Sequence, residues 1–127
     1  MIMKRFFFNF ICISISLVLS AGAHAEQVID YLLIEKVADT DTNSDCTQRG
    51  GLRVVLRNTH PSDIIDVQLD RYFSGVRQAG RSMFALRNGH SQPLGCDIVM
   101  GSDQSWHLID ARVINEQEAL SRYGSIL

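Results

Sequence analysis

The chain has 127 residues, of which 46% are hydrophobic and 20% are charged, and its formal net charge is −2. This length suits a single domain and is too short for two. A net negative charge argues against binding to nucleic acid or to anionic membranes, because both depend on clustered positive charge.

Residues 1–25 have the features of a cleaved signal peptide. A short basic region and an apolar run precede Ala23 and Ala25, which have the small-x-small spacing of a cleavage site. Cleavage would leave residues 26–127 as one domain, with 12 − 2 = 10 basic and 14 acidic residues and a net charge of −4. An uncleaved anchor is the alternative, but the apolar run is shorter than the roughly 20 residues that span a bilayer. We therefore expect a periplasmic or secreted protein without a stable membrane anchor.

Cys46 and Cys96 are the two cysteines that follow the predicted cleavage site. Pairing is expected in the oxidising compartments that exported proteins reach. Closing a loop of about 50 residues would stabilise the fold by roughly 4 kcal/mol on the chain-entropy model. Two separate thiols are the alternative. The Cys-x-x-Cys pattern of thiol-disulfide exchange is absent from the sequence.

The exported domain begins with an apolar segment and a polar one. Residues 28–34 are rich in β-branched and aromatic side chains, which favour a strand. A helix is the alternative, because Val28, Leu32 and Glu35 also fall near helical spacing. Residues 38–50 are polar and acidic, which indicates a surface loop tethered at Cys46. The loop lacks the glycine and the glutamate of a calcium-binding loop, so no calcium site is expected.

Two further segments alternate apolar and charged residues at period two, which is typical of half-buried strands. The apolar positions are Leu52, Val54, Leu56, Ile65, Val67 and Leu69. A tight hairpin around Pro61 would place Arg57 opposite Asp66 and Arg53 opposite Asp70. The alternative is an arch that crosses from one sheet to another, so that these pairs never meet. The arginine and aspartate set is therefore either a cross-strand ladder or a binding surface.

The remaining segments predict shorter strands. Residues 81–86 favour a strand with Phe84 and Leu86 facing inward, and Asn88-Gly89 is a turn signal. Pro93 cannot donate to a ladder, so it belongs at a strand's start or on an edge strand.

The C-terminal part contains a loop, one strand and a tail. Residues 101–105 read as a loop, and residues 106–114 as the last strand. Alternation fails at Leu108-Ile109, which predicts a bulge or two-sided burial there. Residues 115–127 predict either a short helix or a loose tail.

Roughly six or seven short strands at 8–12-residue spacing predict an all-β sandwich. The segment that spans residues 52–114 also resembles the small immunoglobulin-like sandwich domains of exported bacterial proteins. The residues that carry the resemblance are Val54-Val55-Leu56-Arg57-Asn58 before Pro61, Ile65-Asp66-Val67, Leu86-Arg87-Asn88-Gly89, Leu94-Gly95-Cys96, and Trp106, Leu108, Ile109 and Ala111. The resemblance implies a small immunoglobulin-like β-sandwich with a binding or assembly role.

The sequence lacks a catalytic constellation. No Gly-x-Ser-x-Gly elbow and no phosphate-cradling glycine motif is present. We therefore expect a protein that is not an enzyme and that needs no cofactor. A small hydrolase is the remote alternative.

Metal binding is the alternative function that the sequence leaves open. Of the four histidines, His60, His90 and His107 follow the predicted cleavage site, and their spacing is not that of metal ligands. Met83 and Met100 could join His60 and His90 in a soft-metal site of a stress-related envelope protein. Solvated loop histidines and gap-filling methionines are the simpler interpretation, so no metal site is predicted.

Aromatic and arginine residues mark the candidate binding site. By alternation Tyr72 lies on the outer side of its strand, beside Arg71 and near Arg77, and we expect Trp106 to share that exposure. Tyrosine, tryptophan and arginine are enriched in binding hot spots. The alternative is that Tyr72 caps the core edge and Trp106 is buried. The sequence therefore predicts an exported, non-enzymatic module that binds another protein, of the immunity, inhibitor or envelope-assembly type.

Overall fold

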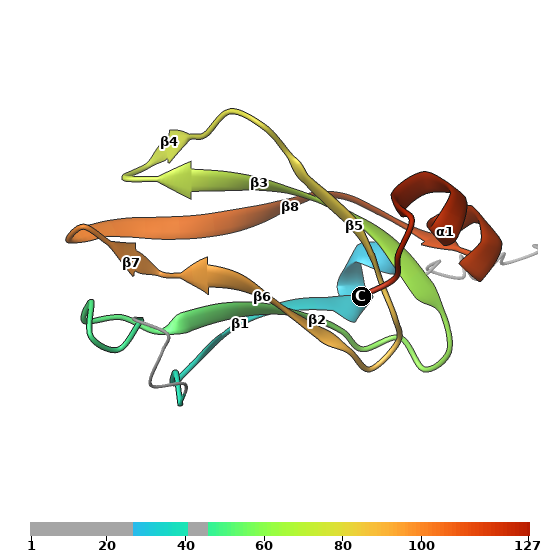
Figure 1. Cartoon of the computed structure of the whole chain (residues 1–127), viewed down its shortest axis with the longest axis horizontal. Coiled ribbons are helices and arrows are strands. Elements are labelled where there is room, and N and C mark those ends of the chain that lie inside the picture. The colour runs from blue at the N-terminus through green and yellow to red at the C-terminus, as the bar shows by residue number, and fades with distance from the viewer. Residues whose placement is uncertain (1–26, 41–45) are drawn as a thin grey trace, which may run out of the picture.

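The structure is a computed structural model that describes residues 27–40 and 46–127. In these residues, eight strands form two antiparallel sheets, and the predicted all-β sandwich is confirmed (Figure 1). Sheet A has the order β1 (Leu32–Val37), β2 (Arg53–Asn58), β6 (Ser91–Cys96). Sheet B has the order β4 (Val76–Arg77), β3 (Ile64–Phe73), β8 (Ser102–Ile114), β7 (Ile98–Val99), and β5 (Ser82–Leu86) also pairs with β3. The predicted signal peptide lies outside the described residues.

The core lies between the two sheets and is built from the apolar positions of the alternating strands. Its buried members are Leu32, Val54 and Leu56 from sheet A, with Ile65, Val67, Leu69, Leu86 and Trp106 from sheet B. Phe84 and Leu86 both pack in this core, as their alternation predicts. β2 and β3 contribute every second residue, because successive side chains point to opposite faces of a sheet.

β2 and β3 belong to different sheets, so the predicted hairpin is wrong and the arch is correct. The expected pairs of Arg57 with Asp66 and Arg53 with Asp70 therefore do not form. Arg57 instead binds Glu35 at 3.1 Å across β1.

The side chain of Asn58, at the end of β2 in sheet A, holds this arch by hydrogen bonds to the arch itself and to β5 of sheet B. Asn58 is fully buried, and its Nδ2 donates to the carbonyl oxygens of Asp63 (3.0 Å) and Leu86 (2.9 Å). Its Oδ1 accepts from the backbone N–H of His60 at 2.9 Å. The chain thus turns from sheet A into sheet B with the polar groups of the arch paired.

The N-terminal segment starts with a helical turn, so the predicted strand at 28–34 is only partly correct. Residues Val28–Tyr31 form a 3₁₀ helix, and β1 starts at Leu32. The turn brings the carbonyl of Tyr31 to Thr59, whose backbone N–H and hydroxyl both donate to it at 2.8 Å.

β8 is longer than predicted and carries the expected bulge. It begins at Ser102, so most of the predicted loop at 101–105 is strand. A two-residue turn at Met100-Gly101, with φ of 52° and 74°, joins it to β7. Gln68 pairs with Asp110 and Leu69 with Leu108, which leaves Ile109 as the extra residue.

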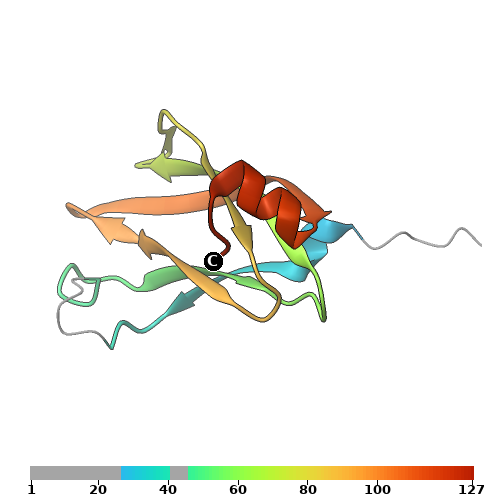
Figure 2. The same cartoon turned by 45° about the vertical axis from the view of Figure 1, so that its right-hand side comes forward.

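The predicted C-terminal helix is present as α1 (Glu116–Tyr123). The side chain of Asn115 caps its first turn by accepting from the backbone N–H of Glu118 at 2.7 Å. Ala119 packs with Ala85 of β5 and Ile114 of β8. Figure 2 shows α1 beside β5, at the end of sheet B that β8 leads into. In the described residues, no helix is long and apolar enough to cross a bilayer.

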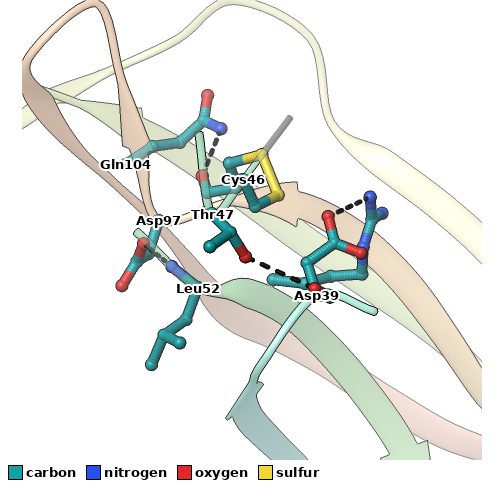
Figure 3. Close-up of a disulfide and its surroundings, with 8 residues drawn as sticks. Asp39, Cys46, Thr47, Leu52, Asp97 and Gln104 are labelled. Carbon is teal, nitrogen blue, oxygen red and sulfur yellow. Dashed lines mark hydrogen bonds and ion pairs between the residues drawn. A yellow bond between two sulfur atoms is a disulfide. The ribbon is translucent and has the colours of Figure 1, made fainter. Parts of the chain in front are cut away.

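The predicted disulfide joins Cys46 to Cys96, with a Cα–Cα distance of 5.1 Å (Figure 3). The loop before β2 is fixed beside it, because Leu52 N–H donates to Oδ1 of Asp97 at 2.7 Å and Asp97 N–H donates back to the Leu52 carbonyl. A Cβ at Gly51 would lie 2.2 Å from Asp97 Oδ1, so a larger residue there would displace the carboxylate that binds Leu52. The disulfide and Asp97 together anchor this loop to the end of β6.

Candidate interaction surface

β3 carries two aspartates on the face of sheet B that points away from the core. Ile65, Val67 and Leu69 face inward, so Asp66 and Asp70 face outward. Both are nevertheless almost inaccessible, with exposed fractions of 2% and 3%. Arginine side chains lie over each of them, and carboxylates are buried in proteins only when such partners are present.

Two arginines clamp Asp70. Arg77 donates from Nε to Oδ2 at 2.9 Å and from Nη2 to Oδ1 at 3.4 Å. Arg81 donates from Nε to Oδ1 at 2.9 Å and from Nη2 to Oδ2 at 3.4 Å. The hydrogen bonds from Arg81, which have the larger effect, and those from Arg77 lower the pKa of Asp70 to about 2. Asp70 is therefore ionised at neutral pH and holds both guanidinium groups in fixed positions.

Tyr72 and His107 continue this surface along the strands. His107 lies opposite Asp70 in the ladder, and Arg77 lies opposite Tyr72. The rings of Tyr72 and His107 contact each other with their centroids 4.5 Å apart. We call Asp70, Tyr72, Arg77, Arg81 and His107 the open cluster.

Asp66 lies in a second cluster that α1 covers. The hydroxyl of Tyr123 donates to Oδ1 of Asp66 at 2.5 Å. Oδ2 makes no hydrogen bond, but it lies 3.4 Å from Nε of Arg112 and 3.5 Å from Nη1 of Arg122. Burial is the main cause that raises the pKa of Tyr123, and the hydrogen bond to Asp66 raises it further. We call Asp66, Arg112, Glu118, Arg122 and Tyr123 the covered cluster.

The structure brings together only part of the predicted binding site. Tyr72 and Arg77 are neighbours, but Arg71 and Trp106 pair on the opposite side of the sheet. Arg71 binds Oε1 of Gln104 at 2.9 Å. The expected exposure of Trp106 is wrong, since it is 7% exposed and belongs to the core. Its ring fits because residue 95 is glycine, where a Cβ would lie 2.9 Å from the indole.

Sequence reasoning missed Asp66, Asp70, Arg81 and His107 as members of one surface. The signal was present, because the alternation in residues 65–70 predicts outward aspartates and the chain is rich in arginine. The assumed hairpin assigned both aspartates to arginines of β2. Their actual partners come from β4, β8, α1 and the residue before β5.

The residues of the metal-binding alternative do not converge. His60 lies in the β2–β3 arch and Met100 in the β7–β8 turn, and Figure 1 shows these connections at opposite ends of the sandwich. His60 is also not a solvated loop histidine, because its Nδ1 accepts from the backbone N–H groups of Ser62 and Asp63. In the part of the chain that the structure describes, no group of three or more His, Cys, Asp or Glu could hold a metal ion.

Comparison with known proteins identifies no relative: no family model, no curated protein and no solved structure matches the chain. The resemblance to immunoglobulin-like domains therefore stays a prediction.

Proposed function

We propose that this protein is an exported, non-enzymatic module that binds another protein through the open cluster on sheet B. The observation that carries the proposal is the arrangement of Tyr72, Arg77 and Arg81 around a buried carboxylate. Arg77 and Arg81 remain 51% and 37% exposed at their side chains. α1 packs at Ala85 and Ile114 and so lies over the covered cluster.

The chemistry of the open cluster supports protein binding. Tyrosine and arginine provide a large contact area with polar tips, and they are enriched in hot spots. Asp70 fixes both guanidinium groups before a partner arrives. The contact between the rings of Tyr72 and His107 also restricts their rotation. Binding then costs less side-chain entropy than it would with free arginines.

Export and the absence of catalysis are part of the same proposal. The signal-like N-terminus and the Cys46–Cys96 disulfide support a periplasmic or secreted location. Ser105 Oγ lies 3.5 Å from Nε2 of His107, an arrangement that a small hydrolase would use. The carboxylate opposite His107 is, however, engaged by four N–H donors from Arg77 and Arg81, which argues against an orienting role for Asp70.

Site-specific photo-crosslinking in the native cell envelope tests this function. Met83 lies opposite Gln68 on the outer face of sheet B, so benzoylphenylalanine at position 83 should form a discrete adduct with one protein. Ser91, exposed on sheet A, is the matched control position. No adduct from position 83, or the same adduct from both positions, would refute the proposal.

A further inference from the structure

The outer face of β3 carries the same arrangement twice. Asp66 and Asp70 are both buried, and each faces two arginines. One arrangement is completed by another element of the chain, and the other is not. The completed arrangement indicates what the open cluster lacks.

α1 completes the covered cluster by supplying an arginine (Arg122) together with an acid, a hydroxyl and an apolar contact. Oε1 of Glu118 binds Nη2 of Arg112 at 2.7 Å, and the hydroxyl of Tyr123 binds Asp66. Ala119 packs beside them against Ala85. Two acids therefore face Arg112 and Arg122, and the covered cluster is neutral.

The open cluster has one acid fewer. Two guanidinium groups face one carboxylate, so Asp70, Arg77 and Arg81 together carry a charge of +1. Each guanidinium binds Asp70 through Nε and Nη2, which leaves the N–H groups of Nη1 facing no acceptor among the described residues. Asp110 is an acid on the same strand as His107, opposite Gln68. Its Oδ1 accepts from the backbone N–H of Ala111 and does not pair with Arg77 or Arg81.

We propose that the open cluster binds a carboxylate side chain of the partner protein, as the covered cluster binds Glu118. The inference rests on the proposed function and names the chemistry of the partner. The partner presents an aspartate or glutamate to Arg77 and Arg81, with an apolar side chain next to it over Tyr72. Charge-assisted hydrogen bonds to arginine favour a planar carboxylate in this place.

The test uses a small probe, so that it does not depend on finding the partner. The side-chain N–H signals of Arg77 and Arg81 in the ¹⁵N-labelled exported protein are followed by NMR during titration with N-acetyl-Glu-Phe-amide. Both signals should shift, while those of Arg112 and Arg122 stay in place. N-acetyl-Gln-Phe-amide, which lacks the charge, should bind about tenfold more weakly.

Variants and a second anion complete the test. Arg77→Gln should weaken probe binding about tenfold, whereas Arg57→Gln on sheet A should leave it unchanged. Unchanged backbone amide spectra establish that both variants are folded. Equal binding of the Glu and Gln probes, or tighter binding of inorganic phosphate than of the Glu probe, would overturn the proposal. If the Glu probe binds but position 83 gives no crosslink in the envelope, the proposed function is refuted and the carboxylate site remains. If position 83 gives a crosslink but the Glu probe does not bind, only this inference is refuted.

Discussion

The hydroxyl of Tyr123 donates a hydrogen bond to the buried carboxylate of Asp66, which joins the last turn of α1 to the centre of sheet B. Replacing Tyr123 with Phe leaves the buried carboxylate of Asp66 with one hydrogen-bond donor fewer. We expect the variant to lose about 1–3 kcal/mol of unfolding free energy. Hydrogen exchange of the α1 amides should rise more than that of β2. Equal exchange in wild type and variant would show that this bond does not hold the helix.

Burial of Tyr123, together with its bond to Asp66, predicts a loss of stability at alkaline pH. The pKa of Tyr123 is raised above 10.0 in the folded protein, so the folded state retains the phenolic proton longer than the unfolded chain. The stabilisation is complete below pH 10 and is lost as the pH rises through the folded pKa. Urea unfolding across this range should show the loss in wild type and not in Tyr123→Phe. Parallel pH profiles of the two proteins would contradict this prediction.

The lowered pKa of Asp70 predicts that stability is lost at acid pH, the opposite direction to Tyr123. Its pKa falls from 3.8 to about 2 because Arg81 and Arg77 bind the ionised form. The resulting stabilisation is present above pH 3.8 and is lost as the pH falls towards 2. Asp70→Asn should be less stable than wild type at neutral pH, and this difference should shrink across that window when unfolding is followed in urea. A difference that is constant with pH would mean that the arginines do not stabilise the charged form.

Replacing Asn58, which belongs to neither cluster, predicts a large loss of stability. Asn58→Ala leaves the carbonyl oxygens of Asp63 and Leu86 without their buried donor, so we expect a loss of about 2–3 kcal/mol of unfolding free energy. Asn88→Ala is the matched control. The exposed Asn88 makes only a 3.5 Å contact with the Pro61 carbonyl, and its loss should cost less than about 0.5 kcal/mol. Similar losses in urea unfolding for both variants would show that Asn58 does not hold the arch.

Replacing Gly95 should change the fluorescence of Trp106, the only tryptophan in the sequence. The added methyl of Gly95→Ala would meet Trp106 at 2.9 Å, and overpacking of this kind costs about 1–3 kcal/mol. The emission of Trp106 should shift to longer wavelength as the ring moves outward. Gly50→Ala is the control, because Gly50 also has a positive φ, so that both substitutions strain the backbone, but no atom lies within 4 Å of its added Cβ. Its emission should match that of wild type.

The architecture could be predicted because alternation is a local signal, and because Cys46 and Cys96 are the two cysteines after the predicted cleavage site. Val54 and Val67 occupy the core as expected, and the bulge lies at Ile109 where alternation fails. The path between β2 and β3 could not be predicted, because it depends on Asn58 finding partners at Asp63 and Leu86. The polar segment Asn58-Thr59-His60 before Pro61 fits a hairpin and an arch equally well.

The candidate site was only partly predictable for a related reason. Tyr72 and Arg77 were expected to be close, since alternation and a short connection determine their positions. The clamp on Asp70 needs Arg81, which reaches it through the separate pairing of β5 with β3. Trp106 was misplaced because its burial depends on a glycine from another strand.

The most direct test of the binding surface compares the crosslink from position 83 in three backgrounds: wild type, Arg77→Gln and Arg57→Gln. In Arg77→Gln the yield of the partner adduct should fall severalfold, and raising the salt concentration should reduce it in the wild-type background. In Arg57→Gln, where the lost guanidinium bound Glu35 on sheet A, the yield should equal that of wild type. Equal yields in all three backgrounds would contradict the assignment of binding to the open cluster.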